Sequence, residues 1–222
     1  MANFEAKIRG MKHAYFCMLS VVGLLSLVGC SATKFVPDGQ YLLNKATVKV
    51  EDTHEVLSQD LRNYLQQKQN TEILGFWKLQ LGIYNTASQD TAKWTSRNAR
   101  KIGEPPVIFS EELTERSMQQ LENAMDNKGY FQAEIDTTKE VKDKKLNLTY
   151  HVTANTPYHI RNYTISFPNA DLQQIAASER FRLLHEGMRF DVDAMNQERQ
   201  RVASAMRRNG CYYFDKELIR FV

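Results

Sequence analysis

A set of helix caps, apolar positions and helix terminators occurs twice in this chain, at an offset of 81 residues (190 − 109). Phe109-Ser110 corresponds to Phe190-Asp191 at this offset, and Gly129 corresponds to Gly210. Ser and Asp cap helix N-termini and Gly ends helices by adopting a positive φ, so both copies predict the same long helix. The apolar positions in between also match, since Leu121, Ala124 and Met125 fall on Val202, Ala205 and Met206. One structural unit is therefore encoded twice.

The first copy has a clear order of elements around its long helix. Alternating apolar residues predict a half-buried strand at Ala46, Val48 and Val50. Helical spacing over Leu57 to Leu65, with Ser58 as a plausible N-cap, predicts a helix next. After the long helix, alternation predicts two more strands on either side of a charged turn at 141–145, and their apolar residues are Phe131, Ala133 and Ile135, then Leu146, Leu148, Tyr150 and Val152. The order strand, helix, helix, strand, strand is an α+β unit.

The second copy repeats this order but ends early. Tyr163, Ile165 and Phe167 predict its first strand, residues 170–181 a short helix, and Tyr212 with Phe214 the opening of another strand. Thr47-Val48 matches Thr164-Ile165 at the larger offset of 117 (164 − 47), so we place an insertion at about 71–107 of the first copy. Because no counterpart of strand 146–152 follows Val222, we expect the second unit to be truncated, in an amino-terminal piece of a longer protein or a truncated product.

The amino terminus has the features of an export signal. Lys7, Arg9 and Lys12 precede an uncharged run from Ala14 to Gly29. That run is short for a membrane-spanning helix, which needs about 20 apolar residues. A basic start before a short apolar segment is typical of a secretory signal peptide.

The end of this segment is more specific. Leu27-Val28-Gly29-Cys30 resembles the lipobox of bacterial lipoproteins. The resemblance implies cleavage before Cys30 and attachment of diacylglycerol and fatty acyl chains such as palmitate to that cysteine, which would hold the protein to a membrane. Ser31 and Ala32, with no Asp following the cysteine, favour export to the outer membrane as in enterobacteria. The alternative is an ordinary signal anchor with a chance cysteine.

These features divide the chain into four parts. We predict a lipoprotein signal peptide at 1–29, a lipidated tether at 30–40, a first unit at 41–155 and a second, truncated unit at 156–222. Composition is that of an ordinary globular protein, 42% hydrophobic and 25% charged, with a net charge of +3 and no basic block. Charge therefore gives no support to nucleic-acid binding.

Tandem units of this order in an exported chain resemble POTRA (polypeptide-transport-associated) domains. The segment Lys101-Ile102-Gly103-Glu104-Pro105-Pro106-Val107-Ile108-Phe109 looks like one that recurs in BamA-like and TamA-like assembly proteins of Bacteroidetes. So do Leu113-Thr114-Glu115-Arg116-Ser117 and Lys128-Gly129-Tyr130-Phe131, and the aromatic segment from Leu79 to Tyr84 accompanies them. The resemblance covers roughly residues 27–222.

The resemblance implies a non-enzymatic function in protein assembly. POTRA domains form a periplasmic arm before an outer-membrane barrel, and they receive unfolded outer-membrane proteins or dock partner subunits. This chain shows no barrel-type strand pattern before Val222, so only the receiving and anchoring parts are expected here. An open sheet edge binds extended clients through main-chain hydrogen bonds, and the candidate edge residues are Phe131, Ala133 and Ile135 in the first unit and Tyr212 and Phe214 in the second. The alternative is that these are ordinary sheet strands whose edges are blocked by a neighbouring POTRA unit or by charge, and the sequence supports both equally.

Other classes of function have less support. One alternative is a free-standing outer-membrane lipoprotein adaptor that binds an assembly partner or the cell wall, and another is a lipoprotein hydrolase. The five His form no metal-ligand pair, and no nucleotide-binding or nucleophile motif occurs, so we predict no metal, no cofactor and no catalytic residue. Cys211 is more typical of a buried structural thiol than of a nucleophile. Trp77 and Trp94 fit a local satellite core, a membrane surface or a partner site.

Overall fold

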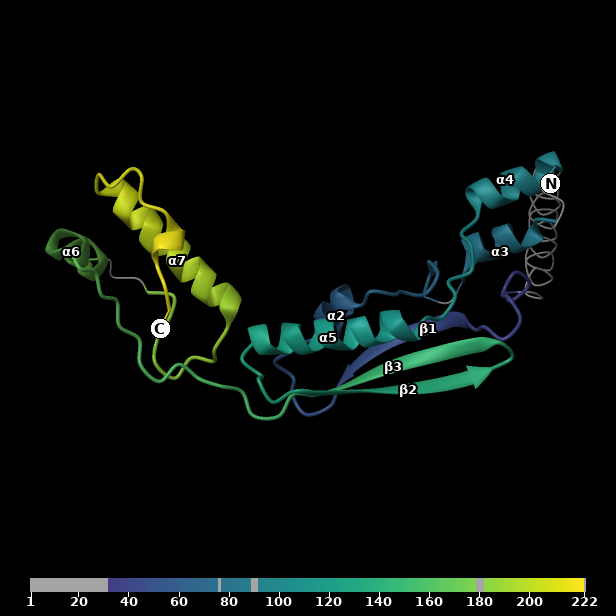
Figure 1. Ribbon diagram of the computed structural model, residues 1–222, viewed down its shortest axis with the longest axis horizontal. Helices are drawn as coiled ribbons and strands as arrows, with labels where there is room; N and C mark the ends of the chain where they lie inside the picture. Colours follow the sequence, from purple (N-terminus) through teal and green to yellow (C-terminus); the bar gives the residue numbers. More distant parts are fainter. Residues whose placement is uncertain (1–31, 76, 89–91, 179–181, 222) are drawn as a thin grey trace, which may run out of the picture. The chain divides into compact units, whose positions relative to one another are not determined.

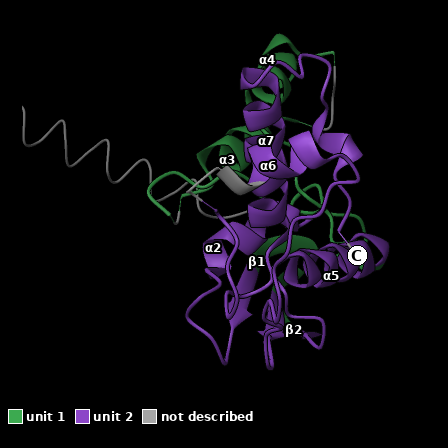
Figure 2. Cartoon of the chain, turned by 90° about the vertical axis from the view of Figure 1, so that its left-hand side faces the viewer, with its two compact units in different colours: residues 1–46, 67–111, 139–148 green, residues 47–66, 112–138, 149–222 purple. Residues whose placement is uncertain are grey.

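The structure is a computed structural model that describes residues 32–75, 77–88, 92–178 and 182–221. It divides into two compact units (Figure 2). Unit 1 comprises Met1–Ala46, Gln67–Glu111 and Lys139–Leu148, and unit 2 comprises Thr47–Gln66, Glu112–Thr138 and Thr149–Val222. The predicted signal peptide and its lipid attachment residue, Cys30, lie outside the described residues.

A three-stranded sheet organises the first repeat (Figure 1). Its strands are β1 (Leu42–Val50), β2 (Glu134–Lys142) and β3 (Lys145–Thr153), in the order β1-β3-β2. The amide of Leu42 donates to the Lys144 carbonyl and the amide of Glu51 to the Val152 carbonyl, so β1 runs parallel to β3. Asp143 and Lys144 both have positive φ, as in the two-residue hairpin turns that join antiparallel strands. β2 and β3 therefore form a hairpin, and only β1 needs a helical crossover.

The core of the first repeat follows the predicted apolar alternation. Along β3 every second residue is buried, and these are Leu146, Leu148, Tyr150 and Val152. β1 contributes four more buried side chains, from Leu42, Leu43, Ala46 and Val48. Because Leu42 and Leu43 are adjacent in β1, they point to opposite faces of the sheet, and Leu42 packs with Val36 and Leu81. In unit 2, the helix α5 (Glu111–Asn127) has buried Leu121, Ala124 and Met125.

The two long helices confirm the predicted repeat. α5 has 17 residues, as does α7 (Val192–Arg208), and both bounds of α5 fall on those of α7 at the offset of 81. Val202, Ala205 and Met206 of α7 are buried like their counterparts in α5. Asp191 caps α7 as predicted, because its carboxylate accepts from the Ala194 amide at 3.0 Å. Gly129 and Gly210 both have positive φ, of 87° and 96°.

The helix after β1 is shorter than predicted. α2 spans only Ser58–Leu61 and continues as the 3-10 turn η2 (Arg62–Tyr64). Leu57, not Ser58, occupies the N-cap position. The Ser58 hydroxyl instead accepts a hydrogen bond from the Val50 amide at 3.3 Å, so it joins the helix to the end of β1 rather than capping it.

Two of the predicted strand segments are not strands in the structure, so those predictions were wrong, and a third strand begins later than predicted. β2 begins at Glu134, so Phe131 and Ala133 precede the strand. Residues 163–167 and 212–214 form no strand, and the second repeat contains α6 (Ala170–Ser178), α7 and the 3-10 turn η3 (Lys216–Leu218). From these two segments, Ile165, Phe167 and Phe214 pack instead against a helical core of Ala176, Val202 and Met206. Leu172, Ile175, Cys211 and Ile219 also partly cover this core. Without a neighbouring strand, the backbone has no ladder to join.

The insertion of the first repeat forms a helical hairpin in unit 1. α3 (Leu79–Thr86) packs against α4 (Trp94–Ile102), a short basic helix. Gly103 ends α4 just before the two prolines. Among the described residues, no helix is both long enough and apolar enough to cross a bilayer.

Candidate functional site

The outer edge of β1 is closed. Within unit 1 the Phe109 amide donates to the Tyr41 carbonyl and the Leu43 amide to the Val107 carbonyl, both at 2.8 Å. The Gln69 side chain accepts from the Ala46 amide at 3.1 Å. Residues 107–109 thus lie antiparallel along the start of β1, and with Gln69 they occupy hydrogen-bonding groups between Tyr41 and Ala46.

The outer edge of β2 is open. β2 is terminal in the sheet, and no hydrogen bond from a described residue outside the sheet reaches its backbone. Ile135 and Thr137 are half-buried, whereas Glu134, Asp136 and every residue from Thr138 to Lys142 are exposed. An open edge presents unpaired N–H and C=O groups to an incoming chain. Charges along β2, such as Lys139, which forms an ion pair with Glu111, oppose unspecific pairing with other edges.

A shallow groove lies at the start of this edge, within unit 2. Met118 and Glu122 of α5 form one side, and the chain from Ala133 to Asp136 forms the other. The groove is therefore lined by an apolar side chain and by carboxylates, beside the first open backbone groups of β2. A pocket beside an open edge suits alternate side chains of an added strand.

A second feature of unit 2 joins the two repeats. The Tyr158 amide donates to the Gly129 carbonyl and the Phe190 amide to the Tyr158 carbonyl, both at 2.8 Å. The Phe131 ring packs edge-on against Tyr158 and in a tilted arrangement against Phe190, with centroids 5.2 Å apart in each case. Phe131 therefore belongs to this contact between the repeats rather than to the open edge.

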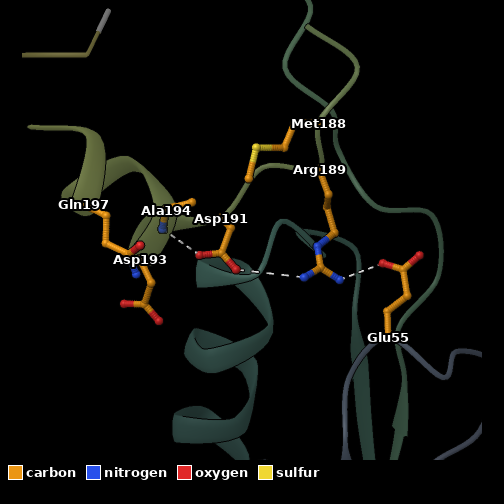
Figure 3. Close-up of a pocket in the computed structure, with 7 residues that line it drawn as sticks. All are labelled: Glu55, Met188, Arg189, Asp191, Asp193, Ala194 and Gln197. Atoms are coloured by element: carbon orange, nitrogen blue, oxygen red, sulfur yellow. Dashed lines mark hydrogen bonds and ion pairs between the residues drawn. The ribbon is translucent and has the colours of Figure 1, made fainter. Parts of the chain in front are cut away.

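We call this contact between the two repeats the joint, and Arg189 makes its polar interactions (Figure 3). The Arg189 guanidinium donates to the Glu55 carboxylate at 2.7 Å. It also donates to the Tyr130 hydroxyl at 3.2 Å and lies 5.4 Å from the Tyr130 ring centroid. On the other side, Asp191 Oδ2 lies 3.8 Å from the guanidinium while its other oxygen caps α7. A small pocket at this point is lined by Glu55, Met188, Arg189, Asp191, Asp193, Ala194 and Gln197. It contains paired charges but no nucleophile with a base.

The second repeat contains a buried charged network of its own. Glu198 accepts from the Tyr163 hydroxyl at 2.6 Å, from the Leu183 amide at 3.0 Å and from two nitrogens of Arg201. Burial raises the pKa of the Glu198 carboxyl, but the hydrogen bonds from Arg201, Tyr163 and Leu183 outweigh it, so the net pKa lies below the ordinary value. Burial, together with the bond to Glu198, raises the pKa of Tyr163. Glu198 occupies the repeat position of buried Ser117 in α5.

Comparison with known families identifies the first repeat. Residues 46–155, from within β1 to just beyond β3, match the family model described as POTRA, surface antigen variable number repeat. This stretch of the chain is similar to a POTRA domain. The crystal structure of the POTRA domains 3–5 of BamA from Haemophilus influenzae is also similar, at 12% sequence identity and a TM-score of 0.26, over 79% of this chain and 89% of that one. No match to a curated protein was found.

In this POTRA-like region the predicted edge residues lie in three different places. Ile135 lies on the open edge of β2, Ala133 lines the adjoining groove, and Phe131 lies in the joint. In the second repeat, Tyr212 is exposed in a turn and Phe214 packs on the helical core. Cys211 is half-buried beside that core. Among the described residues, no three His, Cys, Asp or Glu side chains are grouped as metal ligands.

The joint was not found from the sequence. Glu55 and Arg189 lie 134 residues apart, and neither belongs to a periodic apolar pattern. The one sequence feature that points to this contact is the repeat itself. Gly129 ends the long helix of the first unit, and Phe190-Asp191 begins the long helix of the second.

Proposed function

We propose that this chain is a periplasmic POTRA arm of an outer-membrane protein assembly or translocation factor of the BamA-like or TamA-like kind. It receives unfolded outer-membrane proteins, or docks partner subunits, by addition of a strand to β2. In this proposal Cys30 bears the lipid that anchors the arm to the outer membrane, as in lipoproteins of Bacteroidetes. The family match over residues 46–155 and the open β2 edge support it.

The open β2 edge is the observation that carries the proposal. Residues 107–109 and Gln69 cover β1 from Tyr41 to Ala46, whereas the backbone of β2 is uncovered along its outer edge among the described residues, so β2 is the edge that a client can join. Main-chain hydrogen bonds accept almost any extended sequence, as a receptor for many clients requires. The groove at Met118, Glu122 and Ile135 adds a site for one client side chain.

The described residues of the second repeat form no strand to which a client could add. Tyr212 is exposed, so its ring is available to a client, but it is not on a strand edge. Phe214 contributes to the helical core through its contact with Phe167, at 6.1 Å between centroids. We therefore assign the receiving role to β2.

Site-specific photo-cross-linking tests the proposal. A photoreactive residue is placed at Asp136 or Thr138 of β2 and, as a matched control, at the exposed Lys45 in the covered part of β1. We expect an unfolded outer-membrane protein to cross-link to the β2 positions and not to the β1 position. Equal cross-linking at both edges, or none at β2, would contradict the assignment.

A further inference from the structure

The short helix α4 of the insertion presents an outer face of unusual composition. Trp94, Arg97, Lys101 and Ile102 are exposed, with 69% of Trp94 and 66% of Ile102 accessible. Trp94, Arg97 and Lys101 are three and four residues apart, which places them on one side of the helix. A tryptophan beside basic residues on one helix face is typical of helices that lie in a membrane interface.

The opposite face of α4 is occupied by contacts within unit 1. The buried Ser96 hydroxyl accepts from the Ser88 amide at 3.1 Å. Arg100 donates to the Ser88 carbonyl at 3.2 Å and lies over the Phe35 ring. These contacts fix the rotation of α4 about its axis, so the outer face does not turn inward.

The outer face carries positive charge without compensation. Residues 93–102 contain Lys93, Arg97, Arg100 and Lys101 and no Asp or Glu. In the part of the chain that the structure describes, neither Arg97 nor Lys101 forms an ion pair. An anionic surface is the complement of such a face, and each basic residue near anionic lipid favours binding about fivefold.

Ala32, Lys34 and Phe35, which come shortly after Cys30 in the sequence, are held directly against this hairpin. Lys34 donates to the carbonyls of Asn85 and Ala87, at 3.0 and 2.7 Å, and the Phe35 ring packs on Tyr84. Ala32 packs on the core of Val36, Leu42 and Leu81. Two residues of extended chain reach about 7 Å, so a lipid on Cys30 brings the α3–α4 hairpin to the membrane surface.

We propose that α4 docks on an anionic bilayer surface. Trp94 and Ile102 enter the apolar boundary of the headgroup region, while Arg97 and Lys101 bind the lipid phosphates. This inference rests on the proposed lipid attachment at Cys30, which delivers the helix to the bilayer. Docking gives the anchored protein a second contact and holds unit 1 at the surface instead of on a free tether.

Tryptophan fluorescence tests the docking, because the chain has only two tryptophans. In a Trp77→Phe background Trp94 is the one remaining reporter. The exported protein is reconstituted with vesicles of phosphatidylglycerol and phosphatidylcholine, or of phosphatidylcholine alone, carrying spin-labelled quencher lipids. We expect a blue shift and quenching by shallow quenchers in the anionic vesicles, both reduced with phosphatidylcholine alone.

Charge variants separate the proposed contact from general adsorption. R97Q/K101Q should lower the docking constant about 25-fold, since two basic residues are lost. The matched variant R62Q/K68Q, which removes two exposed charges elsewhere, should leave it unchanged. Quenching that R97Q/K101Q does not reduce would overturn the proposal.

Flotation of the same vesicles reports the Cys30 anchor separately. Protein that floats while Trp94 keeps the emission of a water-exposed indole would overturn the docking of α4 and leave its face to a protein partner. If the protein does not float, the lipid attachment is wrong, and quenching in a large excess of anionic vesicles still decides whether α4 binds lipid.

Discussion

The guanidinium of Arg189 donates to the carboxylate of Glu55 at 2.7 Å, although the two residues lie 134 positions apart. Glu55 follows β1 of the first repeat, and Arg189 precedes the Phe190-Asp191 cap of the second. Their contact adds a polar link to the backbone bonds of Gly129, Tyr158 and Phe190. The joint thus uses the helix terminator of one repeat and the helix cap of the next.

A double-mutant cycle measures this ion pair. E55Q, R189M and the double variant should show a coupling free energy of about 0.5–1 kcal/mol by denaturant unfolding, because Glu55 is exposed and the solvent screens the pair. The matched pair Glu112 and Arg116, exposed within α5, should couple less. No measurable coupling between Glu55 and Arg189 would mean that the ion pair does not stabilise the joint, and that the backbone hydrogen bonds and ring packing hold it.

Gly129 and Gly210 form a natural comparison, because they occupy the same repeat position. A Cβ on Gly129 would lie 2.5 Å from the Phe190 carbonyl oxygen, whereas one on Gly210 would meet nothing within 4 Å. Both have positive φ, so G210A should cost about 1 kcal/mol from backbone strain alone. G129A should cost at least about 2 kcal/mol more, since the joint must also open. Equal unfolding free energies for the two variants would refute the close contact.

Acid should destabilise the second repeat through Glu198. The pKa of its carboxyl in the folded chain lies below the ordinary value of 4.5, so its contribution is complete above that pH and is lost as pH falls below it. E198Q should therefore lower stability by about 1.5–3 kcal/mol at neutral pH and flatten the loss on acidification. The free energy of unfolding is measured between pH 3 and pH 7 for the wild type, for E198Q and for the surface control E217Q. An unchanged acid slope in E198Q would contradict the role of Glu198.

Attachment of lipid at Cys30 has a direct assay. Cells that express the full chain are fed labelled palmitate, and the Cys30→Ala variant is compared with wild type. We expect the wild-type chain to take up label and the variant to take up none. As a matched control, Cys211→Ala should keep the label, because Cys211 packs beside the core of the second repeat. Label retained by Cys30→Ala would exclude the proposed anchor.

Local features of the fold were predictable from the sequence, and pairing across the chain was not. The caps, spacing and terminators of α5 and α7 are encoded within each helix, and the buried face of β3 is encoded by simple alternation. Tyr163 to Phe167 alternates equally well but forms no strand, because a strand requires a neighbour that sequence alternation does not specify.

The candidate site depends on the same distinction. Ile135 was predicted on an edge strand and lies on one, but the start of β2 at Glu134 follows from its pairing with β3. The closure of β1 by residues 107–109 and Gln69 involves long-range bonds that leave no periodic signal. Sequence therefore predicted an edge in the first repeat, and the structure distinguishes its open side from its closed side.

Amide hydrogen exchange of the chain, with and without an unfolded outer-membrane protein, tests strand addition to β2 most directly. Outward-facing amides of β2 should become protected when the client binds, while the covered amides of Leu43 and Ala46 in β1 should be slow in both states. Client binding that leaves exchange along residues 134–142 unchanged would contradict the account.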